Sequence, residues 1–193
     1  MKRIQGIFIL FFVSLIVTAC GGMSVKPIST VEHVDLNKFM GDWYVIANIP
    51  TFIETEAYNA VESYAMNDDG SIKTTFTFRK GSFDGDLKQY NPTGFIRDEQ
   101  SNALWDMQFI WPFKAEYRVI YLDKDYNITI IGRSKRDYVW IMARSPEISE
   151  DVYQSLLNFI AEQGYDISLV QKVPQQWNQS LVDFDQSFYR RKI

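Results

Sequence analysis

Hydrophobic and polar residues alternate in short runs from Trp43 to Arg144, and turn residues separate the runs. Alternation with a period of two predicts β-strands that have one buried face and one exposed face. Short loops join neighbouring strands antiparallel, because a parallel crossover needs a dozen or more residues. Eight such strands are expected to close into an up-and-down barrel, which leaves no open sheet edge. We expect these strands over residues 43–49, 57–66, 71–80, 87–96, 103–110, 115–122, 127–132 and 138–144.

The pattern changes to a helical period after the last of these strands. One apolar stripe is formed by Val152, Leu156, Phe159 and Ile160. Ser149 is the expected N-cap and Gly164 the expected stop. A further short strand is expected over residues 169–173. We therefore predict an all-β fold: an eight-stranded antiparallel up-and-down barrel with one C-terminal α-helix packed on its outside.

Alternation also decides which side chains of each strand face the inside of the barrel. Lys73 and Arg79 mark the outer face of one strand, and Asp106 and Gln108 mark that of another. An eight-stranded barrel is just wide enough for packed side chains or for one small ligand. The inward rings therefore either fill the barrel or line an apolar pocket. The candidate ligand contacts are Tyr58, Glu62, Tyr64, Phe76, Phe78, Trp105, Met107, Phe109, Trp111, Tyr117 and Trp140.

Glu62 is the unusual member of this inward set, because a buried carboxylate without a partner costs several kcal/mol. Three interpretations stay open at this point. Glu62 pairs with Arg144 or with a tyrosine hydroxyl, it meets the cationic headgroup of a ligand, or a shift of strand register places it on the outside.

Composition excludes several classes of chemistry. The chain of 193 residues is 16% aromatic, has a formal net charge of −4, and contains one histidine and one cysteine. A mildly acidic protein has no general attraction for nucleic acid. His33 has no evident partner nearby for a metal site or a catalytic triad. We expect no cofactor and no metal.

The N-terminus has the layout of a secretory signal peptide, with Lys2 and Arg3 ahead of a short apolar core. The run from Val17 to Cys20 (Val-Thr-Ala-Cys) resembles the lipobox of bacterial lipoprotein precursors. The resemblance implies a signal peptide over residues 1–19 and an acylated tether over residues 20–32, with lipid on the Cys20 sulfur and amino group. With that sulfur acylated, no thiol chemistry or disulfide remains. Gly21 and Gly22 are not acidic, which by analogy points to the outer membrane, facing the periplasm.

The chain also resembles the lipocalin family, and most of all its bacterial outer-membrane members, over about residues 33–175. Three family motifs occur in order: Gly41-Asp42-Trp43, the turn at residues 122–126, and Arg144. The bacterial members are matched at Pro112-Phe113, at residues 137–140 and at residues 145–149. The resemblance implies a lipocalin barrel plus helix over residues 33–177, followed by a tail over residues 178–193.

The resemblance assigns structural roles to the three motif residues. Trp43 would plug the closed end of the barrel, Arg144 would lie across it in a cation–π contact, and Gly41 would start the first strand. With the closed end so placed, strand direction puts Phe109, Trp111, Tyr117 and Tyr58 at the open mouth and Trp105 deeper.

The implied function is non-catalytic binding of a small hydrophobic ligand, such as a fatty acid or a lysophospholipid. Such a protein would store or transport lipid in envelope maintenance while Cys20 holds it at the membrane. Two alternatives stay open. One is an envelope interaction module that uses the outer surface or the basic end at residues 190–192, and the other is an enzyme built around Glu62. A monomer and a homodimer are both compatible with the sequence.

Overall fold

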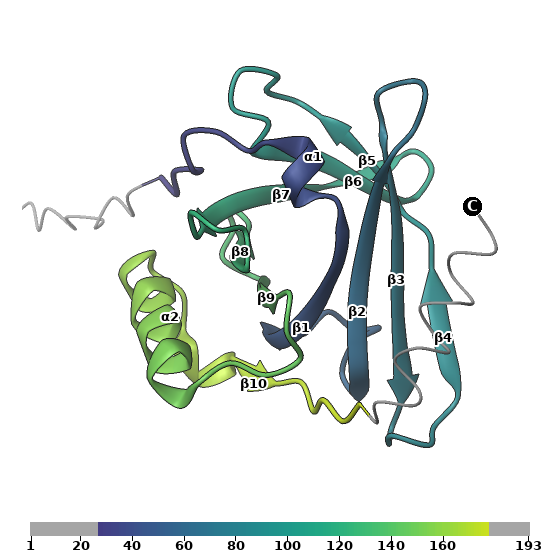
Figure 1. The fold of residues 1–193 in the computed structure, drawn as a ribbon, viewed down its shortest axis with the longest axis vertical. Coiled ribbons are helices and arrows are strands. Elements are labelled where there is room, and N and C mark those ends of the chain that lie inside the picture. The colour runs from purple at the N-terminus through teal and green to yellow at the C-terminus, as the bar shows by residue number, and fades with distance from the viewer. Residues whose placement is uncertain (1–26, 178–193) are drawn as a thin grey trace, which may run out of the picture.

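The predicted barrel is present in the computed structural model, which describes residues 27–177 (Figure 1). Its strands form one antiparallel sheet in the order β10-β1-β2-β3-β5-β6-β7-β8-β9, with β4 beside β3. β1 also pairs with β9, which closes the sheet on itself and confirms the barrel. The strands are β1 (Gly41–Ile49), β2 (Ala57–Met66), β3 (Ile72–Lys80), β4 (Leu87–Tyr90), β5 (Thr93–Ile96), β6 (Leu104–Ile110), β7 (Phe113–Leu122), β8 (Ile128–Gly132), β9 (Val139–Ala143) and β10 (Gln171–Lys172).

Some of the sequence-based expectations concern segments outside the described residues. The signal peptide over 1–19, the anchor at Cys20 and the tail from residue 178 all lie there. Between residues 27 and 177, no helix is long and apolar enough to cross a membrane.

The predicted strand over residues 87–96 is instead two short strands, β4 and β5, and both pair with β3. Pro92 lies between them, and proline has no N–H to donate to a sheet. Its carbonyl still accepts a hydrogen bond from the Thr74 backbone N at 3.2 Å. The last predicted strand, over 169–173, is also shorter, because the 3₁₀ turn η1 (Ile167–Leu169) precedes β10.

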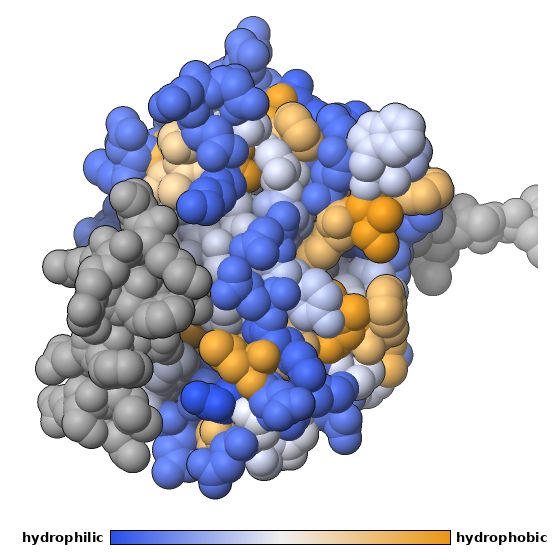
Figure 2. Space-filling model, turned by 90° about the vertical axis from the view of Figure 1, so that its right-hand side faces the viewer, coloured by the Kyte–Doolittle hydropathy of each residue, from blue (hydrophilic) through white to orange (hydrophobic). Residues whose placement is uncertain are grey.

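Within residues 27–177 one long helix, α2 (Glu150–Glu162), packs on the outside of the barrel, as predicted (Figure 1). Leu156 and Ile160 of its apolar stripe are buried in a second hydrophobic core, formed with outward-facing strand residues such as Ile130 and Ile141. Gly164 follows the helix with a φ of +86°, a conformation that glycine adopts without strain. The face shown in Figure 2 is largely hydrophilic where it is coloured, with separate hydrophobic patches.

We predict that Ser149→Ala lowers the free energy of unfolding by about 1 kcal/mol. The Ser149 side chain accepts a hydrogen bond from the Val152 backbone N, one of the four amide groups that a helix start leaves without an internal partner. Urea unfolding measures the change. Ser155→Ala is the matched control, because Ser155 is exposed within the same helix and alanine has the higher helix propensity. Equal stability of the two variants would contradict the assigned cap.

Candidate functional site

One end of the barrel is closed by Trp43, which is fully buried. Its indole Nε1 donates to the Phe39 carbonyl at 2.8 Å, at the end of the short helix α1 (Leu36–Phe39). The Arg144 guanidinium carbon lies 3.8 Å from the centroid of the Trp43 ring, which is a cation–π contact. The sequence-based placement of Trp43 and Arg144 therefore agrees with the structure.

Arg144 also holds the end of α1 in place. Its guanidinium donates to the carbonyls of Lys38, Phe39 and Met40 at 2.8–2.9 Å and to that of Asp42 at 2.6 Å. The carbonyls of Lys38, Phe39 and Met40 are groups that the end of a helix leaves without internal partners, whereas that of Asp42 belongs to β1. Burial lowers the pKa of Arg144 to about 10, so the side chain stays cationic at neutral pH.

Gly41 connects α1 to β1 with a φ of +95°, which L-residues rarely adopt. A Cβ atom at this position would lie 3.4 Å from Arg144 Nη1. Both the backbone angle and the closeness of the guanidinium favour glycine here, which supports a structural role for the residue.

Aromatic rings form a floor above this closed end. Trp105 stacks on Tyr117 with ring centroids 4.7 Å apart and an angle of 3° between the ring planes. Phe39 and Tyr64 meet the Trp105 ring edge-on, at 5.5 and 5.8 Å. Trp105 Nε1 donates to the Asn102 carbonyl at 2.7 Å, so the polar edge of this buried ring is satisfied.

The carboxyl group of Glu62 lies among these rings. Glu62 pairs with Trp43 on β1 and with Phe76 on β3, and both of those residues are buried inside the barrel. Because directly paired residues point to the same face of a sheet, Glu62 points inward. The interpretation that a register shift places it outside is wrong. The Tyr64 hydroxyl donates to the Glu62 carboxylate, and the Tyr117 hydroxyl lies 2.8 Å from that of Tyr64.

Burial raises the pKa of Glu62 to about 7, against the opposing effect of the Tyr64 hydrogen bond; the charge of Glu54 raises it further. Burial also raises the pKa values of Tyr64 and Tyr117 well above the usual range. Near neutral pH, Glu62 can therefore hold or release a proton, while both tyrosines remain neutral donors.

Thr74 adds an unsatisfied polar atom to the same region. It pairs with Tyr64 across β2 and β3, and its side chain is buried. Its Oγ1 has no hydrogen-bond partner among the residues that the structure describes. Since buried polar atoms almost always have a partner, this atom indicates a place for a polar group of a ligand or for water.

The barrel wall between the floor and the mouth is apolar. Phe76, Phe78 and Tyr90 form a cluster of rings with centroids 5.3–6.4 Å apart. Nearer the mouth, Trp140 Nε1 donates to Glu54 Oε1 at 2.8 Å. Glu54 lies in the loop between β1 and β2 and also accepts from the Thr51 hydroxyl at 2.6 Å. Sequence reasoning missed Glu54, because no alternation marks a loop residue as inward.

The comparisons with known proteins agree with this architecture. The sequence profile of the family described as the lipocalin-like domain matches residues 34–175, which is most of the chain. This protein belongs to the lipocalin family. It is 30% identical over 162 residues to temperature-induced lipocalin-1 of Arabidopsis thaliana, covering 78% of this chain and 84% of that one. It is 28% identical over 159 residues to the outer membrane lipoprotein Blc of Citrobacter freundii, covering 80% and 88%.

A solved structure supports the fold alone. Insecticyanin from the tobacco hornworm Manduca sexta superposes with a TM-score of 0.62 at 15% identity, covering 80% of this chain and 87% of that chain.

Eight of the eleven predicted ligand contacts lie together in the interior of the lipocalin barrel, and three lie outside it. Tyr58 was expected inside, but Asn59 has a φ of +49° and the register between β2 and β3 shifts next to it. Tyr58 pairs with Arg79, so it shares the outer face and packs on Phe83, with ring centroids 5.0 Å apart. A β-bulge adds one residue and reverses the faces beyond it.

Two further predicted contacts lie outside the lipocalin interior, at the hairpin between β6 and β7. Phe109 is 50% exposed and Trp111 is 82% exposed. The register of this pair shifts after Met107, and Trp111 belongs to the turn before Pro112 rather than to a strand. Tyr117 was expected at the mouth but lies deep, where it pairs with Trp105.

The interior of the lipocalin barrel is not completely filled by side chains. Glu62 points inward between buried neighbours and yet keeps part of its surface accessible to solvent. Because strands surround it, that accessible surface faces space within the barrel. The aromatic walls, the polar group at Glu62 and this space together make the interior the candidate binding site.

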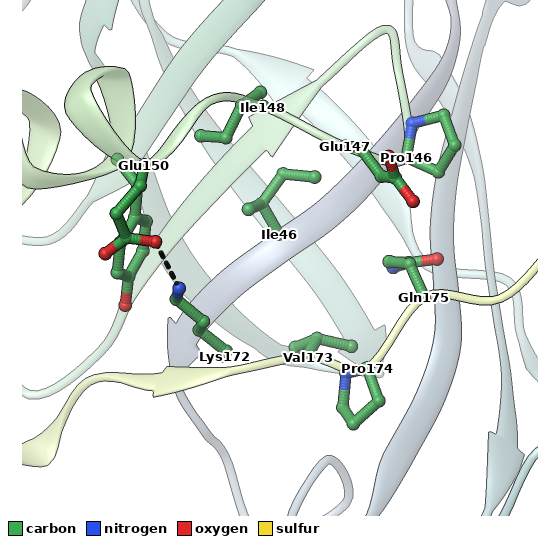
Figure 3. Close-up of a pocket in the computed structure, with 10 residues that line it drawn as sticks. Ile46, Pro146, Glu147, Ile148, Glu150, Lys172, Val173, Pro174 and Gln175 are labelled. Carbon is green, nitrogen blue, oxygen red and sulfur yellow. Dashed lines mark hydrogen bonds and ion pairs between the residues drawn. The ribbon is translucent and has the colours of Figure 1, made fainter.

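A separate pocket of about 320 Å³ lies outside the barrel, between β1, the start of α2 and the segment that follows β10 (Figure 3). Ile46 and Val173 contribute apolar surface to it. Lys172 Nζ binds Glu150 Oε2 at 2.8 Å at its edge. This mixed, charged lining is less suited to an acyl chain than the aromatic interior.

Proposed function

We propose that this lipocalin binds one single-chain lipid, a fatty acid or a lysophospholipid, inside its barrel. The observation that carries the proposal is the combination of ring-lined walls with accessible space beside Glu62. Each buried methylene group contributes about 0.8 kcal/mol. A chain of about fourteen methylenes gains about 11 kcal/mol from burial, which leaves about 7 kcal/mol after a cost of association of about 4 kcal/mol and supports affinity in the micromolar range.

The polar group at Glu62 restricts the chemistry of the ligand. A pure hydrocarbon would leave Thr74 Oγ1 unsatisfied, and burial of an unsatisfied polar atom is unfavourable. A ligand hydroxyl or amine that reaches the floor could donate to Glu62 or to the hydroxyl oxygen of Tyr117, whose own proton is donated to Tyr64.

We further propose that the protein works as an acylated lipoprotein of the outer membrane, facing the periplasm, where it stores or transports lipid in envelope maintenance. The lipobox ending at Cys20 supports this placement. So does the similarity to proteins named outer membrane lipoprotein Blc, from Citrobacter freundii and from other bacteria.

Analysis of co-purified lipid tests the binding function. A soluble form that starts at Gly21 is purified and extracted, and the extract is examined by mass spectrometry. We expect enrichment of single-chain lipids over the lipids of the host membrane. Titration of the delipidated protein with lysophospholipid, below its critical micelle concentration, should then give a saturable change in tryptophan fluorescence. Absence of bound lipid together with absence of any response would refute the proposal.

A further inference from the structure

The hairpin between β6 and β7 ends in an exposed apolar tip, which we define as residues Ile110 to Phe113. Ile110 is 72% exposed, Trp111 is 82% exposed and Phe113 is 76% exposed. Soluble proteins expose single apolar side chains routinely, but consecutive large ones without cover indicate an interaction site. These side chains do not line the barrel interior, since they lie outside it.

Exposed apolar residues concentrate at the same end of the barrel. Strands that run up and down place the loop after β1, the loop after β3 and the tip together at the mouth. Phe52 in the first of these loops and Leu87, the residue of β4 that follows the second, are also exposed. Of the nine large exposed apolar side chains in the described residues, six lie at this end.

The chemistry of the tip suits the surface of a bilayer. Tryptophan and phenylalanine are favoured at membrane interfaces, where their rings sit at the level of the headgroups. Lys114 follows the tip with its Nζ 3.9 Å from the centroid of the Phe95 ring, and residues 109–115 include no acidic side chain. An anionic lipid surface would therefore meet no repulsive charge within this segment.

The tether is long enough to bring the tip to the membrane. The chain enters the described structure beside β7, where Ile28 O accepts from Arg118 Nη1 at 3.2 Å and Val31 N donates to Val119 O at 2.9 Å. Arg118 is about 17 Å along β7 from Phe113, at 3.4 Å per residue. The segment from Cys20 to Ile28 spans at most about 28 Å. Lipid on Cys20 and the tip can thus reach one bilayer together.

We infer that the tip at residues 110–113 inserts into the bilayer interface and holds the barrel mouth against the membrane. A lipid could then pass between bilayer and barrel without crossing bulk water. This inference rests on the proposed anchoring at Cys20, and it adds a second contact that sets the orientation of the barrel.

Fluorescence of Trp111 in vesicles tests the inference. The full acylated protein is reconstituted into vesicles of phosphatidylethanolamine and phosphatidylglycerol that carry lipids brominated on the acyl chain. We expect quenching that is largely lost in Trp111→Phe and unchanged in the matched control Trp177→Phe. Trp177 packs on Tyr44, away from the tip, with ring centroids 5.3 Å apart. Equal quenching in the wild type and Trp111→Phe would overturn the inference.

A variant with a charged residue at the tip distinguishes insertion of the tip into the membrane from lipid binding inside the barrel. Ile110→Glu, which keeps Trp111, should lose most of the quenching while its soluble form keeps the lysophospholipid titration curve of the wild type. If the wild type fails to bind lysophospholipid but Trp111 is still quenched, the binding function is wrong and the membrane contact stands. If instead the emission of Trp111 shifts with protein concentration in the absence of vesicles, as a dimer forms, the tip contacts a second copy and the inference is wrong.

Discussion

Trp43→Ala is expected to lower the free energy of unfolding by about 3–5 kcal/mol. The side chain is fully buried at the closed end, where it contacts the Phe39 ring and carries the Arg144 guanidinium on its face. Its removal leaves a cavity below the aromatic floor and takes away the ring that stabilises the buried cation. Because both losses occur at one place, the destabilisation should lie toward the upper end of this range.

The matched control for this change is Trp111→Ala, which removes the same side chain from an exposed position. Chemical denaturation of the soluble form should show a change within about 0.5 kcal/mol for the control. Similar losses in both variants would show that Trp43 does not have the structural role assigned to it.

Glu62→Gln is expected to remove a marked pH dependence of stability. The pKa of Glu62 is raised by burial from its ordinary value of 4.5 to about 7, so the folded state binds a proton that the unfolded state has released. The stability of the wild type should therefore fall as pH rises from about 4.5 through about 7. The total loss corresponds to about 3 kcal/mol. Glutamine has nearly the same shape, can accept from Tyr64 and carries no charge.

Unfolding curves collected between pH 4 and pH 8.5 test this expectation. The free energies of unfolding of the wild type and Glu62→Gln should nearly agree at the acidic end and diverge above neutral pH, with the variant more stable. Glu56→Gln is the control for general loss of a carboxylate, since the Glu56 side chain is exposed and forms an ion pair with Lys80 at the surface. Parallel curves for the wild type and Glu62→Gln would contradict the buried position of this carboxyl.

The barrel and its closed end were predictable because they depend on regular patterns. Alternation located the strands, and short loops required antiparallel neighbours. The motif residues Gly41, Trp43 and Arg144 identified the closed end through a family resemblance, and the contacts between them explain why these residue types are needed. The helix was equally predictable, because the N-cap Ser149, the apolar stripe and the terminal Gly164 all indicate the same segment.

The sequence-based placement of side chains is wrong where the period of two along a strand is interrupted. The bulge at Asn59 moves Tyr58 to the outer face, and the local alternation of hydrophobic and polar residues does not indicate a bulge there. The shift after Met107 and the turn at Pro112 carry Trp111 away from the interior. The depth of Tyr117 depends on register between strands, which one sequence does not specify.

Calorimetric titration with lysophospholipid, on a set of matched variants, tests the central claim that the lipid lies inside the barrel. The wild type should bind one lipid per chain. Glu62→Trp, which fills the interior space, should weaken binding by at least about tenfold, or 1.4 kcal/mol. Glu62→Gln, which keeps the size of the side chain, and Ala65→Trp, on the exposed outer face of the same strand, should each remain within a few-fold of the wild type. Equal affinity of the wild type and a folded Glu62→Trp would contradict binding inside the barrel.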